Sequence, residues 1–143
     1  MDLRVAELLT KYGLRGTFYV PMKAETETMT AGQIRELGSA FEIGAHTLHH
    51  VDLTAATEAL AWQEMVDSKA WIEDVTGLPC PMFCPPKGRF SAHHLRQLRD
   101  AGYQGARTVE LLSLAFPRPK PESSCCRRPS RRIPTAYWVM RET

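Results

Sequence analysis

Three of the five histidines in this chain lie in one short segment, at His46, His49 and His50. The segment directly follows a mainly apolar run at residues 41–45. Imidazole nitrogens are common ligands of zinc and similar divalent ions, and a neutral imidazole can act as a base near pH 7. If residues 41–45 form a strand, the histidines lie on the loop at its carboxyl end, where α/β folds place their functional groups. The cluster therefore predicts a metal-binding or acid–base site.

Helix and strand patterns alternate along the chain on both sides of this loop. Apolar residues at helical spacing, closed by glycines, predict helices at residues 2–12, 30–38, 54–76 and from 91 to about 101. Thr30 and Gln33 are spaced as in a capping box, and the apolar face predicted for the third helix consists of Leu60, Trp62, Met65, Val66, Ala70, Trp71, Ile72 and Val75. β-Branched and aromatic runs predict strands at residues 16–20, 41–45, 81–84 and 103–109. This alternation predicts an α/β fold with a parallel sheet wrapped by helices. Because such a unit ordinarily starts with a strand, we expect that one strand and its loop are missing before the first helix.

The composition is that of an ordinary globular domain. The 143 residues are 43% hydrophobic and 24% charged, which allows one domain with a real core. No apolar stretch approaches the roughly 20 residues of a membrane span, and the first residues do not resemble a signal peptide. The chain as given is therefore expected to be soluble and cytoplasmic, with no membrane partner, while export of a longer form stays open. The four cysteines lack the spacing of a disulfide framework or of a Cys-x-x-Cys zinc site.

Charge divides the chain into two parts. Residues 1–112 carry 11 Lys and Arg against 14 Asp and Glu, whereas residues 113–143 carry 7 against 2. We predict a domain at 1–112 and a basic tail at 113–143, rich in Pro, Ser and Cys and disordered. A nucleic-acid-binding patch is the alternative for the tail, but it lacks interleaved aromatic residues. No nucleic-acid partner is therefore expected.

Three motifs, in this order, resemble those of the polysaccharide deacetylases, the NodB-like carbohydrate esterases. They are Gly-Thr-Phe-Tyr-Val at 16–20, Glu-Ile-Gly-Ala-His-Thr-Leu-His-His at 42–50, and Phe-Cys-Pro-Pro-Lys-Gly at 83–88. The middle motif, His-[Ser/Thr]-x-x-His after a strand that ends in Ile-Gly, is the most specific, and the resemblance extends from about Leu3 to Val109. It implies a partial, distorted (β/α) barrel with parallel strands. It also implies metal-dependent removal of acetyl groups from N-acetylated oligo- or polysaccharides.

The resemblance assigns roles to the histidine loop. It implies that His46 and His50 hold a divalent metal, most often zinc, together with an aspartate, and that this ion activates a water and polarises the carbonyl. A second aspartate serves as base and a late histidine as acid in that family. In an extended or turn-like loop the two imidazoles can converge on one ion, and His49 should then point elsewhere, such as to a neighbouring helix. Solvent-facing loop histidines remain the alternative.

The third motif departs from the family. The resemblance implies a substrate-binding or oxyanion role for Pro85, Pro86 and Lys87, with the N–H of Lys87 as a donor. The family commonly has an arginine before the prolines, and here the residue is Cys84. Cys84 could be a nucleophile or a third metal ligand, but we expect a small buried thiol. His93 and His94 are adjacent on a predicted helix, cannot converge on one ion, and are expected on the surface.

Two further departures concern the catalytic groups. The family's Thr-Phe-Asp-Asp motif is absent, and Asp2, the only acidic residue near that place, lacks a neighbouring aspartate and receives no role. The late histidine is absent as well. In a shifted reading frame the genetic code permits residues 125–135 to encode a strand ending in histidine, so the tail is hypothesised to be a frameshift product. We therefore expect an impaired enzyme, or alternatively a non-catalytic carbohydrate-binding or scaffold remnant. Exposed barrel edges would favour self-association.

Overall fold

The computed structural model describes residues 2–107 and 138–139. The helices of this part are α1 (Asp2–Lys11), α2 (Ala31–Gly38), α3 (Glu58–Thr76) and α4 (Ala92–Asp100), with a 3₁₀ turn at Pro86–Gly88. The strands are β1 (Thr17–Val20), β2 (Glu42–Ala45), β3 (Met82–Phe83), β4 (Gly105–Ala106) and β5 (Trp138–Val139). Helices and strands alternate from α1 to β4, as the sequence predicts.

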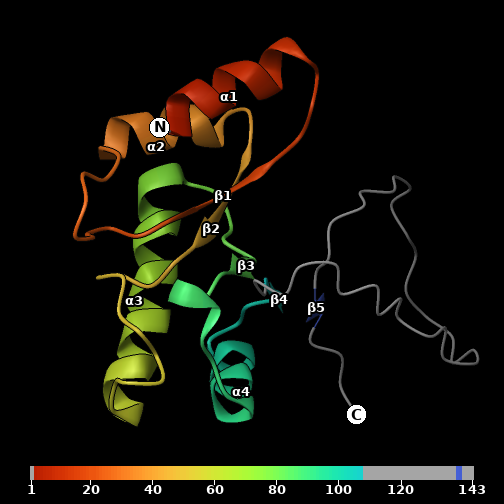
Figure 1. Cartoon of the computed structure of the whole chain (residues 1–143). Coiled ribbons are helices and arrows are strands. Elements are labelled where there is room, and N and C mark those ends of the chain that lie inside the picture. The colour runs from red at the N-terminus through yellow and green to blue at the C-terminus, as the bar shows by residue number, and fades with distance from the viewer. Residues whose placement is uncertain (1, 108–137, 140–143) are drawn as a thin grey trace, which may run out of the picture.

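The strands form one sheet in the order β1-β2-β3-β4-β5 (Figure 1). β1 to β4 are parallel, which confirms the predicted α/β class with a parallel sheet. β5 pairs antiparallel with β4, so the prediction of parallel strands does not extend to it. β5 falls within residues 113–143; the rest of that tail, with its predicted disorder and frameshift, lies outside the described residues.

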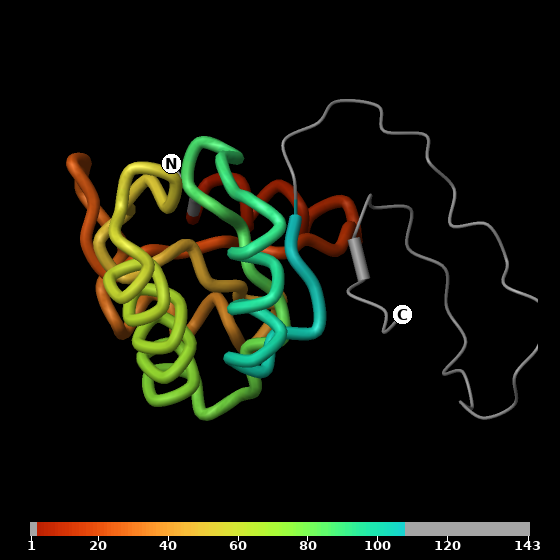
Figure 2. Tube along the Cα trace, turned by 90° about the horizontal axis from the view of Figure 1, so that it is seen from below, coloured from red at the N-terminus to blue at the C-terminus, as the bar shows by residue number. Residues whose placement is uncertain are grey.

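Three helices cover the sheet side by side, with α3 between α2 and α4 (Figures 1 and 2). Parallel strands need such crossover helices, and the apolar sides of both layers form the core between them. The core consists of residues from every layer: Val20, Ile34, Leu37, Ile43, Ala45, Leu53, Ala61, Met65, Ile72, Val75, Cys80, Phe83, Leu98, Tyr103 and Ala106, with Ala6 of α1. The carboxyl end of β2 is thereby held in place by the packed core.

The helix ends follow local hydrogen bonds. Thr30 caps α2 and forms the predicted capping box with Gln33. α3 begins at Glu58 rather than near Thr54, because the N–H and hydroxyl of Thr54 both donate to the side chain of Asp52 and form a separate turn. The inward face of α3 is also rotated from the predicted one, and it buries Ala61, Glu64, Met65, Ser68, Ile72 and Val75. Leu60 and Trp62, predicted on that face, are exposed.

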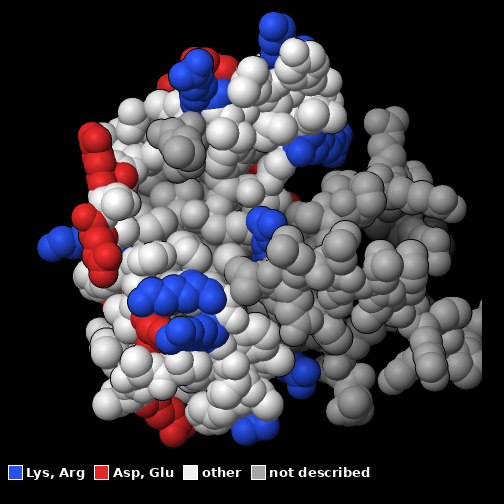
Figure 3. Space-filling model, in the orientation of Figure 1, with Lys and Arg blue, Asp and Glu red and all other residues white. Residues whose placement is uncertain are grey.

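Apolar side chains remain exposed on α1. Leu3, Val5 and Leu8 lie at the surface, as does Tyr12 just after the helix, while Ala6 is buried. The self-association expected from exposed apolar surface stays a prediction. Basic and acidic side chains lie interspersed on the face drawn in Figure 3. Within residues 2–107 and 138–139, no helix has the length and apolar character needed to cross a bilayer.

Candidate functional site

The carboxyl ends of the parallel strands lie in one row. Val20 pairs with Ala45, and Ala45 pairs with Phe83, so the last residues of β1, β2 and β3 are in register. The ladder continues past β3, where the N–H of Cys84 donates to the carbonyl oxygen of Ala45 (2.9 Å). His46 therefore leaves the sheet at this edge, in the position that α/β folds use for functional loops.

The imidazole of His46 is held by the main chain of the neighbouring strand. Its Nδ1 lies 2.6 Å from the carbonyl oxygen of Cys84. Because a carbonyl oxygen only accepts, Nδ1 carries the proton and Nε2 keeps its lone pair. Burial lowers the pKa of His46, the Cys84 hydrogen bond opposes this effect, and the nearby His50 lowers the pKa further. His46 is thus neutral near pH 7, which is the form that binds metal ions.

His50 lies beside His46 because the loop between them turns sharply. The two ring centroids are 5.0 Å apart, and the ring planes are inclined by 52°. Thr47 and His50 have φ values of 60° and 55°, in the left-handed region that non-glycine residues seldom adopt. Thr47 is fully buried, and its Oγ1 accepts the N–H of Val51 (3.1 Å), which stabilises the turn. The loop therefore brings the first and last histidines of the cluster together.

Both rings line one cavity of about 260 Å³. The rest of its wall comes from the end of β1 and the loop that follows: Tyr19, Val20, Pro21, Ala24, Glu25, Thr26, Glu27, Thr28 and Met29. This second loop is joined to the histidine loop, because the N–H of Lys23 donates to the carbonyl oxygen of Leu48 (2.9 Å). The cavity is the space from which a ligand could contact both imidazoles.

His49 points away from this cavity, as the sequence predicts. Its Nδ1 lies 2.7 Å from Oε1 of Glu64, and Oε2 of Glu64 accepts the N–H groups of Leu48 and His49. Sequence reasoning missed Glu64. Its position was the available signal. Glu64 lies one residue before Met65 and four before Ser68, so its carboxylate falls on the side of α3 that faces the core, where an acidic side chain needs hydrogen-bond partners.

The two imidazoles suit a metal ion, because His46 is neutral and oriented and both rings reach one cavity. Two ligands are fewer than the three protein ligands of a typical catalytic zinc site. In the part of the chain that the structure describes, no group of three or more His, Cys, Asp and Glu side chains could hold an ion. Glu25 and Glu27 line the cavity, but they do not complete such a group.

The proline motif forms the turn after β3. Pro85 and Pro86 are buried, whereas Lys87 is exposed and has a φ of 56°. None of these three residues lines the cavity between the two histidines, so their substrate-binding or oxyanion role stays a prediction. Burial raises the pKa of the half-buried Cys84 thiol, with Arg107 as an opposing influence, which disfavours the thiolate of a nucleophile or metal ligand.

The prediction of two surface histidines on α4 is wrong for His94. Only 8% of its surface is exposed, and its Nδ1 accepts the N–H of Ser91 (3.0 Å) in a capping box. In a capping box the side chain of the third helical residue turns back toward the cap residue, and this contact buries His94 although its neighbour His93 is partly exposed. His93 is partly exposed and lies 2.9 Å from a carboxylate oxygen of Glu58.

The family model for polysaccharide deacetylases matches residues 2–106, almost the whole described region. This chain belongs to the polysaccharide deacetylase family. It is 29% identical over 105 residues to the peptidoglycan-N-acetylmuramic acid deacetylase PdaA of Bacillus subtilis, an alignment that covers 71% of this chain. The chain spans 38% of the length of each curated relative that it matches.

Solved structures share this fold. The Streptococcus pyogenes deacetylase PplD, solved in complex with acetate, superposes with a TM-score of 0.64 at 23% identity, over 69% of this chain and 46% of its own. IcaB from Ammonifex degensii superposes with a TM-score of 0.63 at 22% identity, over 73% of this chain and 52% of its own. At identities of 22–23%, these similarities show that the chain has the same fold, and they show nothing further about its function.

Proposed function

We propose that this polysaccharide deacetylase homologue supplies the histidine loop of a metal-dependent hydrolase that removes acetyl groups from N-acetylated oligo- or polysaccharides. The observation that carries the proposal is the pair of imidazoles, His46 and His50, on one cavity at the carboxyl edge of the sheet. Membership of the family supports the reaction class, and hydrolysis of an acetamide needs an electrophile at the carbonyl oxygen.

The chain's own residues would prepare the site in three ways. The Cys84 carbonyl holds the proton of His46 on Nδ1, so Nε2 would be the ligand atom. The sharp turn at Thr47 brings His50 to the same cavity. A divalent ion, zinc being our first expectation, would supply a Lewis acid that polarises the acetyl carbonyl and activates water. The loop of Glu25 and Glu27 forms the facing wall, where a sugar would lie.

Weak metal binding and low turnover are part of the proposal. Two imidazoles bind zinc less tightly than a three-ligand site, and the described residues contain no third ligand beside them. This favours a second candidate function, in which the same fold is a non-catalytic carbohydrate-binding or scaffold remnant. The two functions differ in whether the bound sugar loses acetate.

Acetate release from chitooligosaccharides, with added zinc and with a chelator, tests the proposal. We expect slow, zinc-dependent release that H46A and H50A abolish. H93A is the matched control, because His93 is a histidine outside the cavity, and it should leave the rate unchanged. Sugar binding without metal and without acetate release would support the remnant. Release that is insensitive to chelator and to H46A would refute the metal site.

A further inference from the structure

Glu64 is a carboxylic residue in the interior, with only 4% of its surface exposed. It lies on α3, between the apolar side chains of Ala61 and Met65 on the inward face. A carboxylate in such a place is costly unless hydrogen bonds replace the lost water. Among the described residues, its hydrogen-bond partners are all N–H groups of one loop, the histidine loop of residues 46–50.

The three hydrogen bonds form a clamp on the middle of that loop. Oε2 accepts the consecutive main-chain N–H groups of Leu48 and His49, both at 2.9 Å. Oε1 lies 2.7 Å from Nδ1 of His49, and since a carboxylate only accepts, this nitrogen donates. Hydrogen bonds to a carboxylate are stronger than those between neutral groups. Glu64 therefore fixes both the backbone and the His49 side chain at the centre of the loop.

The loop needs this clamp because its backbone is unfavourable by itself. Thr47, which is β-branched, and His50 both have positive φ. Such conformations persist where the surroundings determine them. The loop is held on the other side by the Cys84 carbonyl at His46 and by Lys23 at the carbonyl of Leu48. Glu64 is the anchor on α3, and it holds Leu48 and His49, which lie between the two histidines in sequence.

We infer that Glu64 is the positioning residue that keeps His46 and His50 converged on one cavity, with His49 as its side-chain partner rather than a ligand. The inference rests on the proposed metal site. Glu64 itself does not line the cavity, so it acts through the loop. Loss of an outer partner that orients metal ligands typically costs about 10- to 100-fold in metal affinity.

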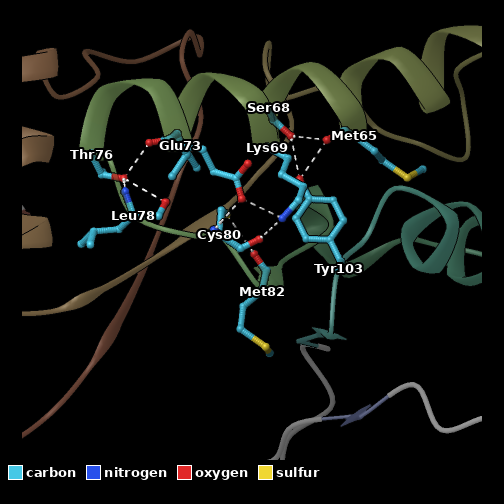
Figure 4. A network of polar contacts seen from close by, with 10 residues as sticks. Met65, Ser68, Lys69, Glu73, Thr76, Leu78, Cys80, Met82 and Tyr103 are labelled. Atoms are coloured by element: carbon cyan, nitrogen blue, oxygen red, sulfur yellow. Dashed lines mark hydrogen bonds and ion pairs between the residues drawn. The ribbon is translucent and has the colours of Figure 1, made fainter.

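The test compares zinc affinity by titration calorimetry for the wild type and the variants E64Q, H49A, H46A and E73Q. Glutamine has the shape of glutamate but no charge. Its one acceptor oxygen forms weaker bonds with the main-chain N–H groups of Leu48 and His49, and its NH₂ group cannot accept the Nδ1 proton of His49, so E64Q weakens the clamp. E73Q is the matched control. Glu73 is another α3 carboxylate that accepts a main-chain N–H, that of Cys80 (3.0 Å), and it also binds Lys69, but neither partner belongs to the histidine loop (Figure 4).

We expect E64Q to weaken zinc binding about 10-fold or more and E73Q to leave it unchanged. H49A should have a smaller effect than E64Q, because the two main-chain bonds to Glu64 remain. Unchanged affinity in E64Q would overturn the inference. So would a loss in H49A as large as that in H46A, since His49 would then be a ligand.

A second readout needs no metal and separates this inference from the proposed function. Imidazole nitrogen NMR of the metal-free protein reports the tautomer and surroundings of His46 and His50. E64Q should shift the signals of both rings, and E73Q should not. If the wild type binds no zinc, the proposed metal site fails, and the NMR comparison alone decides the role of Glu64. Unshifted rings in E64Q would contradict it. Should E64Q not fold, E64D takes its place, because the shorter side chain cannot hold all three bonds, and unshifted rings in E64D would contradict the inference equally.

Discussion

Replacing Gly44 with alanine should force apart β2 and the Tyr19 ring. A Cβ at Gly44 would lie 2.5 Å from Cε1 and 2.6 Å from Cδ1 of Tyr19, and 3.1 Å from the main-chain oxygen of Met82. Carbon atoms pack best at about 3.5–4.0 Å, so the ring must retreat by about 1 Å. Overpacking of this kind costs about 1–3 kcal/mol of unfolding free energy. The ring also lines the candidate cavity.

Urea denaturation followed by circular dichroism measures this cost, and a double-mutant cycle assigns it. G38A is the matched control, because its Cβ would meet only ordinary contacts, 3.4 Å from Thr76 and 3.5 Å from Ile43. We expect G38A to be neutral or stabilising by up to about 1 kcal/mol. In a Y19A background, G44A should cost less than in the wild type, because the ring clash is gone and only the 3.1 Å approach to the Met82 oxygen remains. An undiminished cost in that background would refute the reasoning.

Three other predictions follow from buried groups. F83A should lower the unfolding free energy by about 3–5 kcal/mol in the same denaturation assay, since Phe83 is fully buried in the core. Burial, with His93 as a smaller influence, lowers the pKa of His94 from 6.5, so the folded state binds protons less readily than the unfolded state. The contribution of neutral His94 to the free energy of unfolding should be fully present above pH 6.5 and be lost as the pH drops below it. H94Q can keep the capping box, as Gln33 does in α2. It should therefore reduce the loss of unfolding free energy at low pH, as measured by unfolding curves taken from pH 5 to 8. Burial raises the pKa of Cys80 to about 11, so iodoacetamide at pH 8 should leave Cys80 unmodified by mass spectrometry until urea is added.

Local signals in the sequence predicted most of the framework. The capping box of Thr30 and Gln33, the strand before His46 and the glycine after α3 all act through neighbours in the chain, and all are confirmed. The start of α3 was predicted four residues early because Thr54 is an equally good cap by type. Its bonding to Asp52 depends on the local turn.

The candidate site was predictable only in part. The spacing of His46 and His50 predicted that their rings could converge. The position of His49, one residue before His50, predicted that its ring would point toward a helix instead. Glu64 could not be found in this way, because its partners are mostly main-chain N–H groups, which every residue carries. His94 was misjudged for a related reason, since its partner is the main chain of Ser91. Residue types reveal side-chain pairs more readily than side-chain contacts with the backbone.

The hydrogen bond from His46 to residue 84 has a consequence for sequence variation. The acceptor is the carbonyl oxygen of Cys84, and every amino acid has one. Substitution of the side chain at position 84 should thus leave the ring orientation at position 46 unchanged, provided that β3 keeps its pairing with β2. A homologue could exchange that side chain for another without redirecting the imidazole. The orientation of the imidazole therefore depends on the path of the main chain at position 84 and not on the type of residue there.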